Sequence, residues 1–297
     1  MQMTVFSPAK LNLFLHITAK RDDGYHDLQS VFRAIDFGDE LSFELINPDT
    51  ITDDTPLVTL TGADTLTDDI DDNLIVKALQ TLAAQCPNQA KPIAIHLDKK
   101  IPTGAGLGGG SSNCAATLLA VNTLWALDLD CDTLVNIGAS LGADVPFFIF
   151  SQMKQCDALA MGIGDKLTPL HLPAARYLLL LPHAHLATAH YFSHPKLQKN
   201  CPLLDRIDER YAEYGMVQTA DFTNVFEPIA LSDSAEVAAA MSYLRTLGTQ
   251  TGTTARMSGT GSTVFLPIGD EIDDATLTAW QLSSPCPSVV AVSLYGE

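Results

Sequence analysis

The spacing of apolar residues predicts both strands and helices in the N-terminal half of the chain. Residues 11–17 alternate apolar with other side chains, as in a half-buried strand. Apolar residues at steps of three or four predict helices at 74–86, with Asp72 as N-cap, at 113–127 and at 132–141. Further strands are expected at 30–35, 40–45, 57–61 and 93–97.

The C-terminal half shows patterns of the same kinds. Apolar runs predict strands at 147–150, 177–181, 263–266 and 289–294. A helix is expected at 232–248, because Asp233 and Glu236 form a capping-box pair and Gly248 supplies a stop. Another helix is expected at 274–282.

A glycine-rich segment joins the strand at 93–97 to the helix at 113–127. It reads Pro102-Thr103-Gly104-Ala105-Gly106-Leu107-Gly108-Gly109-Gly110-Ser111-Ser112. Glycine permits positive φ and lets several backbone N–H groups converge on one ligand, and a helix N-terminus favours anions. Ser111 and Ser112 stand where helix N-caps are expected. We therefore predict a phosphate-binding loop.

Other interpretations of the glycine-rich segment fit less well. A Walker A loop has a lysine after its last glycine, and none follows here. A dinucleotide-binding loop follows a strand directly and has an acidic residue about twenty positions on. Asp128 and Asp130 lie near that distance, but residues 99–102 make a poor strand end. A flexible linker is the remaining alternative, although linkers rarely run straight into an amphipathic helix.

The overall charge restricts the partners of the protein. Acidic residues outnumber basic ones by 35 to 17, which gives a formal charge of −18. We therefore expect no nucleic acid and no anionic membrane as a partner. No signal peptide and no membrane span is expected, and the six scattered cysteines favour reduced thiols and a cytoplasmic location.

Two charged residues stand where either a structural or a catalytic group can stand. Lys10 immediately precedes the strand at 11–17, and a lone lysine at a strand end is usually solvated. Asp144 lies in apolar surroundings after Gly142, where a carboxylate is either a helix N-cap or a catalytic group. The local residues alone favour a solvated side chain for Lys10 and a structural role for Asp144.

Three aromatic side chains are candidates for contact with a ligand. Asp23-Gly24 signals a tight turn, followed by the flat ring of Tyr25 and the imidazole of His26. An ordinary hairpin tip is the alternative. Phe192 lies in an expected aromatic-bearing loop at 186–197, and a core phenylalanine is the alternative there.

Five segments, in this order along the chain, resemble motifs of the GHMP kinases, the superfamily of galactokinase and of homoserine, mevalonate and phosphomevalonate kinases. They lie at residues 8–15, 21–26, 102–112, 141–146 and 258–262. The second, Arg-x-Asp-Gly-Tyr-His, resembles a signature of one branch only, the 4-diphosphocytidyl-2-C-methyl-D-erythritol kinases. The last, Ser258-Gly259-Thr260-Gly261-Ser262, is either a simple hairpin turn or a phosphate-adjacent motif.

The resemblance implies an α/β (α+β) fold of two domains with the active site in the cleft between them. Residues 1–165 would form an ATP-binding domain similar to domain 2 of ribosomal protein S5, and residues 166–297 a ferredoxin-like domain. A monomer or a homodimer that acts on a small molecule is expected.

The resemblance also implies a reaction and a set of site residues. The γ-phosphoryl group of ATP would pass to the 2-hydroxyl of 4-diphosphocytidyl-2-C-methyl-D-erythritol, in the non-mevalonate route to isoprenoid precursors. Residues 102–112 would hold ATP, Asp144 would accept the hydroxyl proton, and Lys10 would counter the developing charge. The substrate would be bound by Asn12, Tyr25, His26 and Phe192, with the base between the two aromatic rings. Mg²⁺ is expected with ATP; its protein ligand is unknown, and Ser112 is the best candidate.

Three alternatives stay open from the sequence. Another GHMP kinase, of the homoserine or mevalonate type, would share the glycine loop but would have no use for a base clamp at Tyr25, His26 and Phe192. A non-catalytic nucleotide sensor would not need Lys10 and Asp144. An RNA-binding module of S5-like fold would need a basic face, and this chain is strongly acidic.

Overall fold

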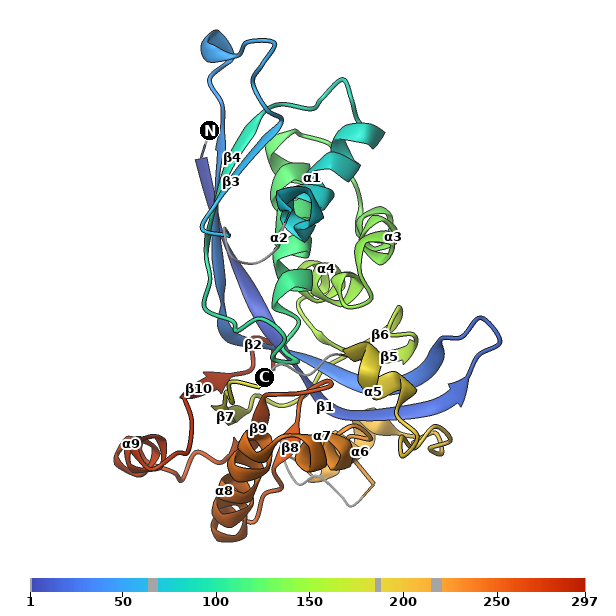
Figure 1. Cartoon of the computed structure of the whole chain (residues 1–297), viewed down its shortest axis with the longest axis vertical. Coiled ribbons are helices and arrows are strands. Elements are labelled where there is room, and N and C mark those ends of the chain that lie inside the picture. Colours follow the sequence, from blue (N-terminus) through green and yellow to red (C-terminus); the bar gives the residue numbers. More distant parts are fainter. Residues whose placement is uncertain (1, 64–68, 185–187, 215–220, 297) are drawn as a thin grey trace. The chain divides into compact units, whose positions relative to one another are not determined.

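Two compact units make up the protein (Figure 1). The computed structural model describes residues 2–63, 69–184, 188–214 and 221–296. Unit 1 consists of residues 1–9, 38–103 and 108–154, and unit 2 of residues 10–37, 104–107 and 155–297. These units are groups of residues that pack together. They do not test the sequence domains 1–165 and 166–297, which stay a prediction.

Two long strands, β1 (Gln2–Lys20) and β2 (His26–Leu45), contribute residues to both units. The sequence predicted two strands at 30–35 and 40–45, but β2 is continuous. Gly38 lies in its middle, and a Cβ atom at this position would clash with the backbone of Ser7 and the ring of Phe6. Gly38 therefore lets β1 approach β2 closely instead of ending the strand.

The part of unit 1 that the structure describes combines a small group of paired strands with four helices. β3 (Val58–Thr61) pairs in parallel with β4 (Ile93–Asp98), and β4 pairs antiparallel with residues 40–45 of β2. α2 packs against each of the other three helices (Figure 1). The helices are α1 (Leu74–Gln85), α2 (Gly109–Leu124), α3 (Cys131–Leu141) and α4 (Val145–Lys154), and two short 3₁₀ turns lie at Pro48–Thr50 and Ile70–Asp72.

Two details of unit 1 differ from the sequence prediction. The N-cap of α1 is Asn73, whose Oδ1 accepts from the Ile75 N–H at 2.9 Å, whereas Asp72 pairs with Lys77. The apolar run predicted as a strand at 147–150 belongs to α4. Its Pro146 stands in the first helical turn, where the missing N–H is not needed, and a short apolar run does not separate a buried strand from a buried helix.

The described residues of unit 2 form a second set of strands and five helices. Residues 28–32 of β2 pair antiparallel with β5 (Asp157–Gly162), which pairs with β6 (Lys166–Leu170). A four-stranded antiparallel sheet has the order β10 (Ser288–Val292), β7 (Arg176–Leu180), β9 (Val264–Ile268), β8 (Arg256–Met257). The helices are α5 (Thr188–Ser193), α6 (Ile207–Tyr214), α7 (Glu227–Asp233), α8 (Ala235–Thr251) and α9 (Asp274–Leu282).

The helix predicted at 232–248 corresponds to α8, and its first two predicted residues belong to the preceding helix α7. α7 ends at Asp233, and Ser234 caps α8 by accepting from the Val237 N–H at 3.3 Å. α8 continues to Thr251 and ends at Gly252, which has a φ of 71°. Its inner face, which includes Val237, Met241 and Leu244, belongs to the same core as strands β7 and β9. The structure also contains α6, which the sequence pattern did not predict, and places α5 within the expected loop at 186–197, where residues 186 and 187 lie outside the described part.

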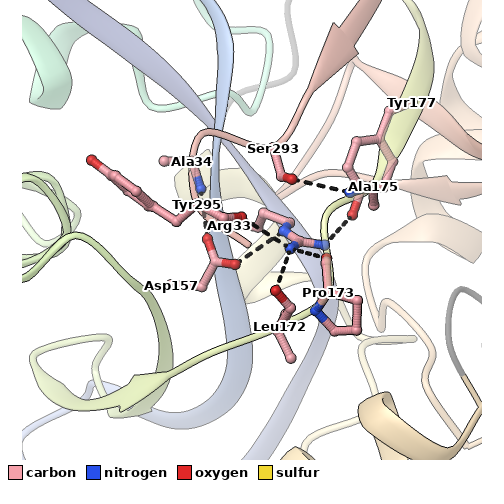
Figure 2. A network of polar contacts seen from close by, with 9 residues as sticks. All are labelled: Arg33, Ala34, Asp157, Leu172, Pro173, Ala175, Tyr177, Ser293 and Tyr295. Carbon is pink, nitrogen blue, oxygen red and sulfur yellow. Dashed lines mark hydrogen bonds and ion pairs between the residues drawn. The ribbon is translucent and has the colours of Figure 1, made fainter. Parts of the chain in front are cut away.

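A buried ion pair ties the last residues of unit 2 to β2 (Figure 2). Arg33 Nε lies 3.0 Å from Asp157 Oδ2, and both side chains are almost fully buried. Arg33 also donates to the Tyr177 hydroxyl at 3.0 Å and to the backbone carbonyls of Leu172, Pro173 and Tyr295 at 3.4, 2.5 and 3.3 Å. The C-terminal residues are therefore held by a side chain from near the start of the chain.

None of the helices that the structure describes has the length and apolar character of a membrane span. All six cysteines are free thiols.

Candidate active site

Helix α2 begins without a side-chain cap. Its N-cap residue is Gly108, with a φ of 72°, and this residue makes no side-chain cap hydrogen bond. The first turn also contains no acidic residue. Ser111 and Ser112, which the sequence placed as N-caps, lie inside the helix because the helix starts at Gly109, earlier than predicted. The N-terminal N–H groups of α2 can therefore bind an anion.

Buried polar side chains of unit 1 hold the start of α2. Ser7 Oγ lies 2.8 Å from both Ser112 Oγ and Asn113 Oδ1, and all three residues are buried. Ser112 is fully buried, so its hydroxyl would have to exchange its present partner to ligate a metal ion. The described residues include no cluster of three His, Cys, Asp or Glu side chains suited to a metal ion.

The middle of the glycine-rich segment packs against the hairpin between β8 and β9, within unit 2. Gly106 has a φ of 75°, and a Cβ atom there would clash with the Ser258 carbonyl oxygen and lie 2.8 Å from that of Gly261. Ser258 Oγ donates to the Gly106 carbonyl at 2.9 Å, and the Thr263 N–H donates to the Ala105 carbonyl at 3.1 Å. The hairpin at 258–262 therefore supports residues 104–107.

Lys10 is buried next to the same part of the segment. Only 3% of this residue is exposed, which overturns the solvated interpretation. Its N–H donates to the Leu107 carbonyl at 3.0 Å, and its Nζ donates to Asn12 Oδ1 at 2.5 Å and lies 4.6 Å from the centre of the Phe32 ring. The structure thus joins the backbone of Lys10 to the glycine-rich segment and turns its ammonium to Asn12.

Asn12 links Lys10 to two hydroxyl groups. Its Nδ2 donates to Ser30 Oγ at 3.0 Å, and its N–H donates to Ser258 Oγ at 3.2 Å. Asn12 is therefore held at both its backbone and its side chain, which fixes the orientation of the amide oxygen that receives Lys10.

Asp144 lies immediately before Val145, the first residue of α4. It is half-buried, and α4 packs against α2 within unit 1. The Val145 N–H donates to the Gly142 carbonyl at 3.2 Å, so a tight turn leads from α3 into α4 through Asp144.

His26 and Phe192 lie together in unit 2, and Tyr25, which precedes His26 in sequence, is exposed. The rings of His26 and Phe192 have centroids 5.5 Å apart and planes inclined by 33°. Phe192 is partly buried and also contacts Phe226 at 4.9 Å, so it belongs to the edge of the core. Tyr25 has 61% of its surface exposed on the turn that Asp23 stabilises. Of the two predicted ring partners of Phe192, His26 lies against it, together with the core residue Phe226.

The His26 imidazole has an unused polar atom. Its Nε2 is buried and has no hydrogen-bond partner among the described residues. Burial lowers the pKa of His26, and the charges of Lys199 and Lys20 lower it further. The ring is therefore neutral at pH 7, with one nitrogen that can donate and one that can accept.

Sequence reasoning missed several side chains that hold this site. Asn224 Nδ2 donates to the carbonyls of Met257 and Gly259 at 2.7 and 2.8 Å, which fixes the hairpin that supports the glycine-rich segment. Ser7 and Ser30 hold the start of α2 and Asn12. Their partners are far away in sequence, so no local pattern could identify them.

Comparison with known proteins defines the class of this fold. The family described as "GHMP kinases N terminal domain" matches residues 73–152. The fold is similar to that of Methanococcus jannaschii mevalonate kinase, with a TM-score of 0.67 at 14% identity over 99% of this chain and 98% of the other. The α/β fold is thus that of the GHMP kinases.

Closer similarities define the family within this class. The chain is 46% identical to the 4-diphosphocytidyl-2-C-methyl-D-erythritol kinase of Psychrobacter cryohalolentis, over 98% of this chain and 97% of that protein. A crystal structure of 4-(cytidine 5'-diphospho)-2C-methyl-D-erythritol kinase matches with a TM-score of 0.77 at 28% identity over 98% of each chain. The chain belongs to the family of 4-diphosphocytidyl-2-C-methyl-D-erythritol kinases.

Two glycines of the segment provide a matched test of its packing. Gly106→Ala should lower the free energy of unfolding by more than about 1 kcal/mol, because alanine is strained at positive φ and its methyl group would clash with the hairpin. Gly110→Ala should change it little or raise it slightly, since the new methyl group would have its nearest neighbour, Leu74 Cδ1, at 3.9 Å inside a helix. Urea unfolding of both variants gives the comparison, and equal midpoints would show that the hairpin does not constrain Gly106.

Proposed function

We propose that this protein transfers the γ-phosphoryl group of ATP to the 2-hydroxyl of 4-diphosphocytidyl-2-C-methyl-D-erythritol, a step in the supply of isoprenoid precursors. The observation that carries this proposal is the buried Lys10, whose backbone N–H is bound to the glycine-rich segment and whose ammonium is oriented by Asn12. Membership of the kinase family gives the substrate class. We expect the protein to act in the cytoplasm on this small molecule, as a monomer or homodimer without nucleic acid.

Residues 102–112 bind the phosphates of ATP in this proposal. The uncapped first turn of α2 supplies N–H groups, and glycines at 104, 106 and 108 supply the left-handed backbone that lets the segment curve. When bound, Mg²⁺ would neutralise charge on the transferred group. Ser112 is the residue of the segment that would reach it, after release from Ser7, and the other ligands would be phosphate and water oxygens.

Asp144 and Lys10 perform the chemical step in this proposal. The Asp144 carboxylate accepts the proton of the attacking hydroxyl, and the Lys10 ammonium stabilises the oxygen that loses it. Burial of Lys10 in unit 2 strengthens its electrostatic effect, because the surrounding protein screens less than water.

The cytidyl group is bound by Tyr25, His26 and Phe192, with Asn12 near the reacting end. The unpartnered Nε2 of His26 supports this role, because a base offers donors and acceptors at its edge and a buried polar atom gains from pairing. Phe192 and the exposed ring of Tyr25 offer flat faces for stacking.

The activity is tested by measuring ADP release by the wild-type protein with a panel of alcohols. The cytidyl substrate should be phosphorylated at the 2-hydroxyl, whereas homoserine and mevalonate should give no turnover above background. Phosphorylation of homoserine or mevalonate in preference to the cytidyl alcohol would move the protein to another branch of the superfamily. No turnover of any alcohol, with ATP still bound, would favour the sensor.

Substitution of His26 should affect the alcohol substrate and not ATP. His26→Ala should raise KM for the cytidyl substrate by roughly tenfold to a hundredfold, the value of a hydrogen bond of about 1–3 kcal/mol. Because the lowered pKa keeps the imidazole neutral, the wild-type KM should be flat near pH 7 and should rise as the pH falls below about 6.5. In His26→Ala this rise of KM at low pH should be absent. An equal rise of KM for ATP would contradict the assignment.

Substitution of Asp144 and Lys10 should affect the chemical step. Asp144→Asn and Lys10→Met should each bind both substrates nearly normally and lose kcat, by about 10²–10⁴-fold for a general base. The double variant should be little worse than the poorer single variant, because both groups act on one proton transfer. Single-turnover kinetics measures the step directly. Asp144→Asn with kcat within about threefold of wild type would return Asp144 to a structural role, and strictly multiplicative losses would separate Lys10 from Asp144.

A further inference from the structure

Asp39 is a fully buried carboxylate in unit 1 whose role the proposed chemistry leaves unexplained. It follows Gly38 on β2, next to Glu40, which forms the last pair of the β2–β4 ladder with Asp98. The chain leaves β4 at Asp98 and enters the glycine-rich segment four residues later. Asp39 therefore lies where the sheet ends and the approach to the segment begins.

Both oxygens of Asp39 bind this approach. Oδ1 accepts the N–H groups of Lys100 and Ile101, each at 2.7 Å, and Oδ2 accepts the Lys99 ammonium at 2.6 Å. Two of these donors are backbone groups that would otherwise have no partner after the ladder ends. The carboxylate thus fixes three consecutive residues, at their backbone or their side chain.

The residues that Asp39 fixes form the surface on which α2 begins. A Cβ atom built on Gly109, the first residue of α2, would lie 3.0 Å from Ile101 Cγ2 and 3.0 Å from Lys99 Nζ. Gly109 therefore rests directly on the side chains of Ile101 and Lys99. On the other side, Ser7 holds Ser112, and Gly38 permits the close approach of its strand. Two neighbouring residues of β2 thus support the first turn of α2. Gly38 permits the close approach of the strand that carries Ser7, and Asp39 holds Lys99 and Ile101.

The Lys99 ammonium adds an electrostatic argument. A cation beside a helix N-terminus is the reverse of the stabilising arrangement, because the N-terminal end of a helix is itself positive. Only 19% of the Lys99 side chain is exposed, so water screens its charge poorly, and Asp39 is its ion-pair partner at 2.6 Å. A bound phosphate group would be attracted by both the helix and the ammonium.

We propose that Asp39 is a positioning residue for the nucleotide: it holds Lys99, Lys100 and Ile101 so that the first turn of α2 stays in place to bind phosphate. This inference rests on the proposed function, because it assumes that ATP binds at residues 102–112. Asp39 acts through these residues and does not itself touch ATP.

Three variants separate the two kinds of contact that Asp39 makes, with the Lys99 ammonium and with the backbone N–H groups of Lys100 and Ile101. Asp39→Asn keeps an oxygen for the N–H groups of Lys100 and Ile101 but turns an amide donor toward the ammonium. Lys99→Met removes the ammonium and leaves the backbone contacts of Asp39 in place. The double variant removes the opposed charges together. Lys77→Met is the matched control, because it removes the same charge from an exposed pair with Asp72 on α1.

The Kd for ATP is measured by calorimetry, and KM and kcat are measured with both substrates. Asp39→Asn should weaken ATP binding by roughly tenfold or more, and Lys99→Met by roughly threefold to tenfold, with KM for the alcohol and saturated kcat within about threefold of wild type. The double variant should be no worse than Asp39→Asn, because the two side chains form one unit. Lys77→Met should match wild type.

Several results would overturn the inference. ATP affinity within about threefold of wild type in both Asp39→Asn and Lys99→Met would show that the contacts of Asp39 do not position the nucleotide. A loss in Lys99→Met equal to that in Lys77→Met would assign it to overall charge. Parallel losses for ATP and the alcohol would assign the effect to general stability, and Lys99→Met decides the matter if Asp39→Asn does not fold. Failure of the wild-type protein to turn over ATP would instead refute the proposed function.

Discussion

The N–H groups at the start of α2 receive no side-chain cap, and several polar contacts of unit 1 described above support this helix start. An ordinary helix satisfies these groups with a side-chain cap, as Asp130 does for α3 and Ser234 for α8. α2 has Gly108 instead, so the stability that a cap would provide must come from elsewhere. In unit 1 it comes from Ser7 and from the residues that Asp39 fixes. The helix start is thus held by its surroundings and not by its own sequence.

In unit 2, residues 104–107 also depend on other segments to hold their backbone in place. A glycine-rich backbone has few side chains with which to anchor itself, and here its carbonyl groups are the anchors. Ala105, Gly106 and Leu107 each accept one hydrogen bond, from Thr263, Ser258 and Lys10. Because Lys10 and Asn12 are held by the same contacts, the position of the ammonium is coupled to the path of the backbone. A change in the hairpin at 258–262 is therefore expected to alter the position of the Lys10 side chain.

The sequence predicted features that depend on neighbouring residues, and it failed where distant residues decide. The glycine run, a helix after it and the hairpin at 258–262 follow from local composition. The structure confirms the helix and the hairpin, but the helix begins at Gly109 and not at residue 113. The resemblance to a kinase family identified Lys10, which the local pattern alone would have left solvated. In contrast, Val145–Lys154 became a helix because its apolar residues are buried on several sides, a fact that the pattern does not contain. Asp39 looks like an ordinary turn residue after glycine, since its partners lie about sixty positions further along the chain.

The paths of β1 and β2 also limit how this protein can be taken apart. Unit 1 consists of three separate stretches of chain and unit 2 of another three, and each of the two strands contributes to both. No single cut in the gene therefore yields either unit, and neither can be exchanged between relatives by joining segments end to end. Recombination within this family is expected to tolerate crossovers in turns, such as 163–165 between β5 and β6, more readily than swaps of a whole half. Fragment complementation would have to divide the chain within a turn and rebuild both units at once.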